Sequence, residues 1–253
     1  MTAHQRPAFS ENYAKLQAAQ KSSKGAPLYS LLVNRPLGRV VAAAAHRLGM
    51  TPDQITIVSA VFTFSGIAII ALLPPSLGQA VLVTLLLVLG YALDAADGQL
   101  ARLRGGGSMT GEWLDHVIDS FKIATLHLAV LIAVYRFFDV SPIWLLVPIT
   151  FSAVYVIHFF GMLLTDLLTR NALLTMGMGK EPPRSGSNVM SLLKLPTDYG
   201  LLCLSFLLLA YPPAFLWFYL FLTVANAGYT VLVIGVWYRR LRSLDALLVA
   251  RAE

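Results

Sequence analysis

Acidic side chains are concentrated in one short stretch of the chain. Five of the 13 Asp and Glu residues fall between positions 94 and 119, namely Asp94, Asp97, Glu112, Asp115 and Asp119. They lie within or beside the ends of two long apolar stretches, where a carboxylate is costly unless it is paired, hydrated or bound to a metal ion. We therefore expect these acids to be functional.

The spacing of the acids places them on single helix faces. In the first stretch, the residues at offsets 0, +3, +4, +7 and +8 are Asp94, Asp97, Gly98, Ala101 and Arg102. In the second stretch, the residues that repeat every fourth position are Gly111, Asp115 and Asp119. A Gly-rich turn joins the two helices, so we expect four carboxylates to converge on one water-filled pocket. Gly98 and Gly111 would leave room there for a ligand to approach the backbone.

These ligand types indicate a chemistry. A set of hard oxygen ligands without His or Cys favours Mg²⁺ or Mn²⁺, and also suits Ca²⁺ better than Zn²⁺. Four aspartates can hold a pair of divalent ions, and such pairs stabilise in-line displacement at phosphorus. We therefore expect phosphoryl transfer. The alternative is a proton or Na⁺ pathway, which also uses carboxylates within the membrane but does not require small residues and an arginine at these positions.

The composition places the helices in a membrane. Of the 253 residues, 57% are hydrophobic and 13% are charged, and the mean hydropathy is +0.69, which excludes an ordinary water-soluble domain. Cys203 is the single cysteine, so an intramolecular disulfide and a Cys-based metal site are excluded. The net charge of +6 does not indicate nucleic-acid binding, because the positions of the charges matter more than their sum in a membrane protein.

Apolar windows of about 20 residues, the length that crosses a bilayer, predict six transmembrane helices. They cover residues 52–76, 79–103, 109–137, 142–168, 187–211 and 213–238. An amphipathic helix before the first span is predicted to lie in the membrane interface. The sequence thus predicts an all-α polytopic protein, with a cytoplasmic N-terminal segment and interfacial helix (1–50), a six-helix catalytic domain (51–240) and a cytoplasmic tail (241–253).

Basic residues predict the orientation of these helices. With six spans, 17 of the 19 Lys and Arg residues lie on one side of the membrane. The positive-inside rule makes that side the cytoplasm, so both termini are expected there. The acidic ends of the second and third spans are on the same side, and the pocket should therefore open to the cytoplasmic face of an inner or plasma membrane.

The acidic stretch resembles a known signature. From Asp94 to Asp119 it reads D-x-x-D-G-x-x-A-R, then eight residues, then G-x-x-x-D-x-x-x-D. This resembles the signature of the CDP-alcohol phosphotransferases, also called CDP-alcohol phosphatidyltransferases, and matches it at every fixed position. The segment T-P-D-Q-I-T, from Thr51 to Thr56, is similar to the T-P-N-x-x-T of that family, with Asp53 in place of the usual Asn.

The resemblance implies a six-helix bundle, often a homodimer, that cleaves a CDP-linked donor, passes a phosphoalkyl group to an alcohol and releases CMP. It implies two Mg²⁺ or Mn²⁺ ions bound by Asp94, Asp97, Asp115 and Asp119. Asp119 would also be the general base on the acceptor hydroxyl, or serve only as a metal ligand. The CDP donor would contact Thr56, Gly98, Ala101, Arg102 and Gly111.

The resemblance also suggests the classes of the two substrates. We expect CDP-diacylglycerol as donor, drawn from the membrane lipids, and a small polar alcohol or its phosphate as acceptor. The alternative within the class is a CDP-linked polar alcohol that donates to a lipid or soluble alcohol. Two basic residues of the loop after the fourth span, Arg184 and Lys194, are candidates for binding a phosphorylated acceptor. Outside the class, an ion-coupled transporter and a catalytically silent scaffold are alternatives.

Four other polar residues lie in the predicted spans. Lys122 and Asp166 are expected to face the interior of the bundle, although their partners cannot be predicted. His116 and His158 could contact the acceptor or a phosphate, but lone histidines more often satisfy packing.

Overall fold

The structure is a computed structural model that describes residues 9–18, 27–178 and 194–252. Every regular element in these ranges is a helix, which confirms the predicted all-α class. The α-helices are α1 (Phe9–Ala18), α2 (Arg35–Leu48), α3 (Pro52–Leu72), α4 (Leu77–Leu103), α5 (Met109–Phe137), α6 (Leu146–Thr175), α8 (Tyr199–Ser205) and α9 (Pro212–Ala252). Shorter helical segments are η1 (Ser30–Asn34), η2 (Pro142–Leu145), η3 (Leu195–Thr197) and η4 (Phe206–Ala210).

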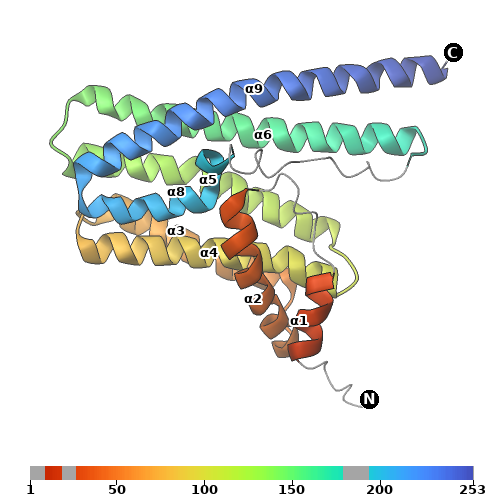
Figure 1. The fold of residues 1–253 in the computed structure, drawn as a ribbon, viewed down its shortest axis with the longest axis horizontal. Helices are drawn as coiled ribbons and strands as arrows, with labels where there is room; N and C mark the ends of the chain where they lie inside the picture. The colour runs from red at the N-terminus through yellow and green to blue at the C-terminus, as the bar shows by residue number, and fades with distance from the viewer. Residues whose placement is uncertain (1–8, 19–26, 179–193, 253) are drawn as a thin grey trace.

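The long helices form a bundle whose members run along the long axis of the molecule (Figure 1). Helix α3 packs on α4 and α5, α5 packs on α6, and α6 packs on α9. The α3–α4, α5–α6 and η4–α9 connections lie at the left end of Figure 1, whereas the α4–α5 turn, the end of α6 and the end of α9 lie toward the right. Successive helices therefore alternate in direction, as helices that cross a membrane repeatedly must.

Local sequence signals set the helix ends next to the acidic stretch. Helix α3 begins with a capping box, in which the Thr51 hydroxyl accepts from the Gln54 N–H at 3.2 Å and the Gln54 side chain accepts from the Thr51 N–H at 2.9 Å. Helix α4 ends just before Gly105 and Gly106, which adopt φ values of 98° and 139°. Residues other than glycine rarely adopt such values. This turn ends α4 and leads into α5.

Five described helices are long and apolar enough to cross a membrane, and they correspond to five of the six predicted spans. The predicted span at 187–211 differs. Its described part is the apolar segment Tyr199–Ala210, formed by α8 and η4, and residues 187–193 lie outside the described ranges. At about 1.5 Å per residue such a segment reaches little more than halfway across a bilayer. Pro196 lies in the first turn of η3, where a proline is favoured. Asp198 is the N-cap of α8, where its side chain accepts from the Gly200 N–H.

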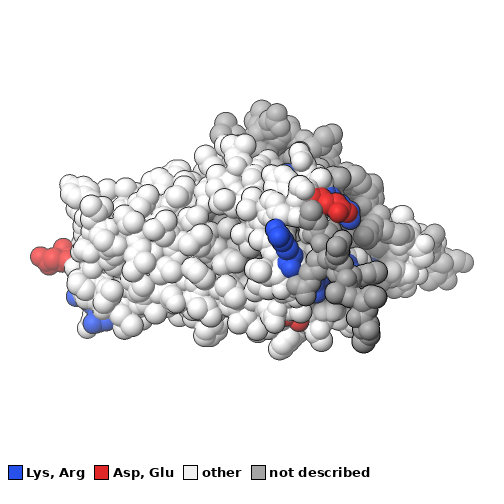
Figure 2. Space-filling view, turned by 90° about the horizontal axis from the view of Figure 1, so that it is seen from below, with Lys and Arg blue, Asp and Glu red and all other residues white. Residues whose placement is uncertain are grey.

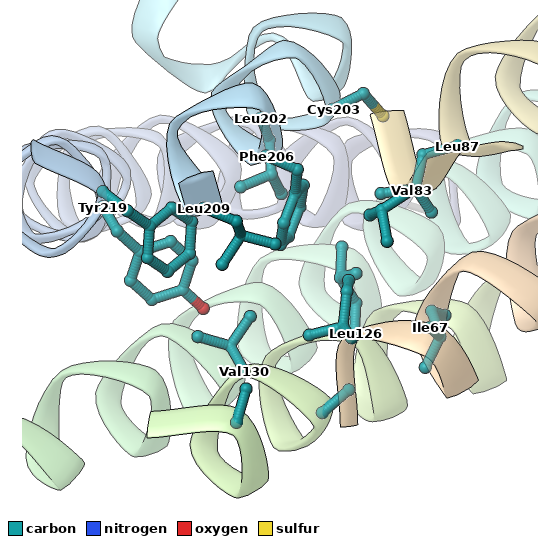
Figure 3. Close-up of a cluster of buried hydrophobic side chains, with 14 of the residues drawn as sticks. Ile67, Val83, Leu87, Leu126, Val130, Leu202, Cys203, Phe206, Leu209 and Tyr219 are labelled. Atoms are coloured by element: carbon teal, nitrogen blue, oxygen red, sulfur yellow. The ribbon is translucent and has the colours of Figure 1, made fainter. Parts of the chain in front are cut away.

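Figure 3 shows part of the main hydrophobic core. This core combines α3, α4, α5, α6, α8, η4 and α9, with fully buried residues such as Leu87, Leu126, Phe206 and Tyr219. The outer surface is also apolar. On the face shown in Figure 2, charged side chains lie toward the two ends and a broad uncharged band separates them. Such a band suits contact with lipid acyl chains.

Helix α2 crosses the bundle and packs on α4 (Figure 1). The contact is close, because a Cβ atom at Gly38 would lie 2.8 Å from Gln99 Nε2 and 3.1 Å from Ala95 Cβ. The Gln99 amide donates to the Arg35 carbonyl at 3.2 Å. Other α2 residues, including Leu37 and Val40, are exposed. Helix α2 is therefore held against the end of α4 that carries the acidic stretch.

Candidate active site

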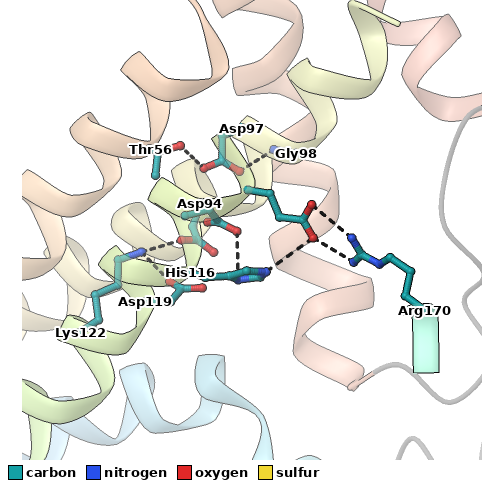
Figure 4. A network of polar contacts seen from close by, with 10 residues as sticks. Thr56, Asp94, Asp97, Gly98, His116, Asp119, Lys122 and Arg170 are labelled. Atoms are coloured by element: carbon teal, nitrogen blue, oxygen red, sulfur yellow. Dashed lines mark hydrogen bonds and ion pairs between the residues drawn. The ribbon is translucent and has the colours of Figure 1, made fainter. Parts of the chain in front are cut away.

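Helices α4 and α5 bring the predicted aspartates onto facing surfaces (Figure 4). The Lys122 ammonium joins two of them, lying 2.6 Å from Asp94 Oδ1 and 3.1 Å from Asp119 Oδ1. Its third neighbour is the Ser59 hydroxyl of α3 at 3.5 Å. Lys122 is 7% exposed, so its charge is largely withdrawn from solvent and compensated by the two carboxylates.

Asp97 is held from a different side. The Thr56 hydroxyl donates to Asp97 Oδ2 at 2.6 Å, and the Gly98 N–H donates to Asp97 Oδ1. Asp97 and Thr56 are both buried. The capping box that starts α3 thus positions the hydroxyl that orients Asp97.

A third group of polar side chains surrounds Asp115 on α5. Single ligand atoms of Asp115, His116 and Asp119 all lie within 4.8 Å of one another, which is close enough to share a cation. His116 Nδ1 lies 3.9 Å from Asp115, and His116 Nε2 lies 4.0 Å from Glu112. Glu112 in turn accepts from Arg170 of α6 at 2.9 Å. This chain of contacts ties α5 to α6 at the edge of the site.

Two cavities adjoin the aspartates. One has a volume of about 520 Å³ and lies at the α4–α5 turn; we call it the turn cavity. Its lining includes Asp97 and Asp115, together with all five residues predicted to contact the donor, which are Thr56, Gly98, Ala101, Arg102 and Gly111. The family-like segment also reaches it through Asp53, whose Oδ1 would lie 3.0 Å from a Cβ atom at Gly111.

The second cavity has a volume of about 360 Å³ and lies deeper in the bundle; we call it the inner chamber. Asp94, Asp119 and Lys122 line it from α4 and α5, while Asp198 and Asn226 come from the start of α8 and from α9. The sequence predicted that all four aspartates line a single pocket. In the structure, two line the turn cavity and two line the inner chamber. Asp94 and Asp97 are three residues apart on α4, so they are neighbours on one helix surface but open into different cavities.

Three further residues that the sequence singled out lie outside the acidic stretch. Arg184 lies outside the described ranges. Lys194 precedes η3, where its carbonyl accepts from the Thr197 N–H and hydroxyl. It is not part of the inner-chamber lining, although Thr197 is. Asp166 is exposed and lies 3.8 Å from Arg240, so the expectation that it faces the bundle interior was wrong.

The structure adds functional candidates that the sequence did not single out. Lys122 was predicted only to face the interior. Its pairing with Asp119 is between neighbours on α5, whereas its pairing with Asp94 of α4 depends on how α3 holds both helices. Asp198 accepts from the N–H groups of Tyr29, Ser30 and Gly200, at 2.9, 3.3 and 3.0 Å. It thus joins the segment before α2 to the start of α8. The spacing of Asp119 and Lys122 is a local signal, but the contacts of Lys122 with Asp94 and of Asp198 with Tyr29 and Ser30 have none.

The fold and the site together define an all-helical membrane protein with two cavities that are lined by carboxylates. The family model for CDP-alcohol phosphatidyltransferase matches residues 49–237, which is well over half of the chain. The protein therefore belongs to the CDP-alcohol phosphatidyltransferase family, and the resemblance noted in the sequence is confirmed.

Two curated proteins are similar over part of the chain. An archaetidylinositol phosphate synthase of Pyrococcus horikoshii is 36% identical over 94 residues, which are 37% of this chain and 47% of that protein. A phosphatidylinositol phosphate synthase of Corynebacterium glutamicum is 38% identical over 79 residues, which are 31% of this chain and 34% of that protein. The chain thus aligns with less than half the length of the curated relatives it matches.

One solved structure covers most of the fold. It is the Mycobacterium tuberculosis phosphatidylinositol phosphate synthase in complex with manganese and citrate. The TM-score is 0.50 at 20% identity, over 81% of this chain and 89% of that one. At this identity the comparison supports a shared fold.

Proposed function

We propose that this protein transfers a phosphate-linked group from a CDP-linked donor to an alcohol and releases CMP. The observation that carries the proposal is the lining of the turn cavity, where Asp97 and Asp115 meet the five residues expected to contact the donor. The remaining two signature aspartates border the adjoining inner chamber. One set of carboxylates thus stands between two cavities, as transfer between two substrates requires.

The turn cavity is the proposed site for the CDP moiety of the donor. Gly98 and Ala101 present little side chain on the α4 face, which leaves space for the cytidine. Arg102, one turn further along α4, is placed to contact the diphosphate, because a guanidinium matches phosphate geometry. Gly111 keeps the facing helix equally bare, and Thr56 orients Asp97 at 2.6 Å.

The donor set fits two divalent cations of the Mg²⁺ or Mn²⁺ type. The residues that would hold them are Asp94, Asp97, Asp115 and Asp119. Carboxylate oxygens are the preferred ligands of these ions, and ligand atoms of Asp115 and Asp119 already lie within 4.8 Å of each other. Bound ions would neutralise phosphate oxygens during displacement at phosphorus. His116 offers a further ligand atom in the same group.

Asp119 is the proposed general base. It lines the inner chamber, next to the space where an acceptor hydroxyl would approach. Lys122 binds its Oδ1 at 3.1 Å and so fixes the direction in which the carboxylate points. The other oxygen of Asp119 can then receive the hydroxyl proton.

We propose CDP-diacylglycerol as the donor, because the two curated relatives are named as phosphatidyl and archaetidyl synthases and the outer surface is apolar. The acceptor is then a polar alcohol. The reverse arrangement, with a CDP-linked polar alcohol as donor, is supported by the largely aromatic walls of the inner chamber, which also suit an apolar alcohol. CMP release measured with each donor separates the two arrangements.

The membrane arrangement is part of the proposal. Six spans would consist of the five long helices and a segment ending in α8 and η4, with α2 in the membrane interface and both termini in the cytoplasm. The α4–α5 turn, whose residues line the turn cavity, lies at the end of the bundle that would then face the cytoplasm (Figure 1). The parts are a 1–50 segment, a 51–240 catalytic domain and a 241–253 tail, and the exposed apolar faces allow a homodimer.

The proposal is tested by incubating the purified chain in lipid with a CDP-linked donor, an alcohol, and Mg²⁺ or Mn²⁺. CMP and a transfer product are expected in equal amounts, and chelation of the metal is expected to stop both. An ion-coupled transporter or a scaffold would release no CMP.

A further inference from the structure

The inner chamber has a chemistry different from that of the turn cavity, and this difference bears on the acceptor. We infer that the inner chamber binds the acceptor and that the acceptor is an uncharged alcohol rather than a phosphate ester. The inference rests on the proposed function, since it assigns the second substrate of the same reaction. It is carried by the charge, the hydrogen-bonding groups and the shape of the chamber.

The charge of the lining argues against a phosphorylated acceptor. Among the residues that line the chamber in the described part of the chain, Lys122 is the one Lys or Arg. His158 also lines it, with Nδ1 3.2 Å from the Thr230 hydroxyl. The Lys122 ammonium is already engaged at 2.6 Å by Asp94 and at 3.1 Å by Asp119. A phosphate ester is usually bound by several free cationic donors. Here Lys122 has little capacity left for such a group.

The opposite end of the chamber is rich in hydrogen-bond acceptors. Asp198 is 1% exposed and holds three backbone N–H groups, so its side chain is fixed in place. A carboxylate has about four acceptor positions, which leaves room for one more donor. Asn226 uses its amide hydrogens on the carbonyls of Pro196 and Leu222, at 3.0 and 2.8 Å. Its remaining polar atom in the chamber wall is the acceptor Oδ1. Both residues therefore suit hydroxyl donors and repel phosphate oxygens.

The side walls are aromatic. Tyr91 and Tyr199 pack edge to face with ring centroids 5.0 Å apart, and Tyr155 and Phe159 form the wall on the α6 side. Aromatic rings make favourable contacts with C–H groups, so they suit the body of a polyol or the apolar part of a lipid alcohol. The volume of about 360 Å³ is near the lower end of small-molecule sites. The chamber can therefore hold one small alcohol or the head of a larger one.

The short α8 explains how the chamber exists. The chain turns at Thr197 and Asp198, which both line the chamber, and Asp198 accepts from the Tyr29 and Ser30 N–H groups. A Cβ atom at Gly200 would collide with the Tyr29 ring, so the two segments pack directly on each other. The half-length helix and the segment before α2 together close the chamber.

The proposed step balances between the two cavities. The alcohol in the inner chamber gives its proton to Asp119 as its oxygen forms a bond to the donor phosphorus that carries the transferred group. The bond from that phosphorus to the oxygen shared with CMP breaks, and CMP leaves with the electron pair. The phosphodiester product then spans the aspartates.

Matched acceptor pairs test the inference. Purified protein in nanodiscs with Mn²⁺ is given CDP-diacylglycerol and either inositol or inositol phosphate, or either glycerol or glycerol phosphate. A second arm gives CDP-glycerol with diacylglycerol, which distinguishes a lipid alcohol from a polyol. A phosphate in the chamber would lack a cationic partner, because Lys122 is already paired with Asp94 and Asp119. CMP release with the unphosphorylated acceptor should therefore be at least about tenfold faster than with its phosphorylated counterpart. Faster release with a phosphorylated acceptor would overturn the inference but leave the proposed function intact. No CMP with any combination would overturn both.

Variants of the chamber give a second readout. Asn226→Ser should raise the KM for the acceptor by roughly 3- to 10-fold, the value of one lost hydrogen bond, while the donor KM stays unchanged. Thr223→Val is the matched control, since Thr223 is buried on the same helix but donates only to the Tyr219 carbonyl. If Asn226→Ser does not fold, Phe159→Leu alters the aromatic wall and should act in the same direction. A change in the donor KM alone would contradict the assignment.

Discussion

The turn cavity and the inner chamber are each lined by two of the four signature aspartates but differ in almost every other respect. The turn cavity is built by residues close together in sequence, on α3, α4 and the start of α5, and it contains two arginines, Arg102 and Arg104. The inner chamber is built by segments from both ends of the chain and has aromatic walls. We propose that this difference separates recognition of the charged nucleotide from recognition of the alcohol. Asp94 and Asp97, which are neighbours on α4, line the inner chamber and the turn cavity, respectively.

The largest effect on activity is expected at the two aspartates that line the turn cavity. Asp97→Asn and Asp115→Asn each remove one charged metal ligand and should lower CMP release roughly 1,000-fold, because metal-mediated charge stabilisation amounts to several kcal/mol. Asp166→Asn is the control, since that carboxylate is exposed and lies outside both cavities. Unchanged turnover in Asp97→Asn and Asp115→Asn, with folding preserved, would rule out the proposed metal site.

Removal of Lys122 should affect the chamber side of the comparison. Lys122→Met leaves Asp94 and Asp119 without their shared cation, so kcat should fall roughly 10- to 100-fold as the base loses its orientation. The concentration of Mn²⁺ needed for half-maximal rate should decrease at the same time, because the site becomes more negative. Titration of the rate with Mn²⁺ measures both quantities. A lower kcat with no change in metal dependence would indicate that Lys122 has only a structural role.

A bulkier α4 face should affect the donor alone. A Cβ atom at Gly98 would meet only Arg102 Nη1 at 3.7 Å, so Gly98→Ala fits the protein but reduces the space for the nucleotide. We expect the donor KM to rise about tenfold, with an unchanged acceptor KM and a thermal stability that is equal or slightly higher, because alanine favours a helix over glycine by about 1 kcal/mol. Gly78→Ala, where the new Cβ meets nothing within 4 Å, is the matched control. An increase in the acceptor KM instead would reverse the assignment of the cavities.

The smallest effect is expected at Thr56. Thr56→Val removes the 2.6 Å hydrogen bond to Asp97 but keeps the volume, so kcat/KM for the donor should fall about 3- to 10-fold. Thr125→Val, which loses only bonds to carbonyls of its own helix, should behave as the wild type. Equal activity of both variants would show that Asp97 does not depend on α3 for its orientation.

The sequence predicted the turn cavity far better than the inner chamber. The predicted span 109–137 coincides with α5, and 79–103 differs from α4 by two residues. Every predicted donor contact lines the turn cavity. The sequence could place these residues together because helical spacing and a Gly-rich turn act locally, within 26 residues from Asp94 to Asp119. Their contact with a donor stays a prediction.

The inner chamber depends on contacts that no local pattern encodes. Asp198 binds the Tyr29 N–H across 169 residues of sequence, and Asn226 approaches from α9. The apolar window at 187–211 predicted a continuous helix, since hydropathy does not register the effect of Pro196 and Asp198 on where α8 begins. The pairing of Lys122 with Asp94 likewise required α3 to hold both α4 and α5. Burial and long-range hydrogen bonds had to be observed in the structure.

The most direct test of the central claim is CMP release in Asp97→Asn beside the unaltered chain. Both proteins are purified in lipid and offered CDP-diacylglycerol or CDP-glycerol, with an alcohol and Mn²⁺. We predict CMP and transfer product in equal amounts from the unaltered chain, loss of both on chelation, and almost none from the variant. Release that continues in the presence of a chelator, or that is equal in the folded variant, would contradict transfer across a metal-binding aspartate site.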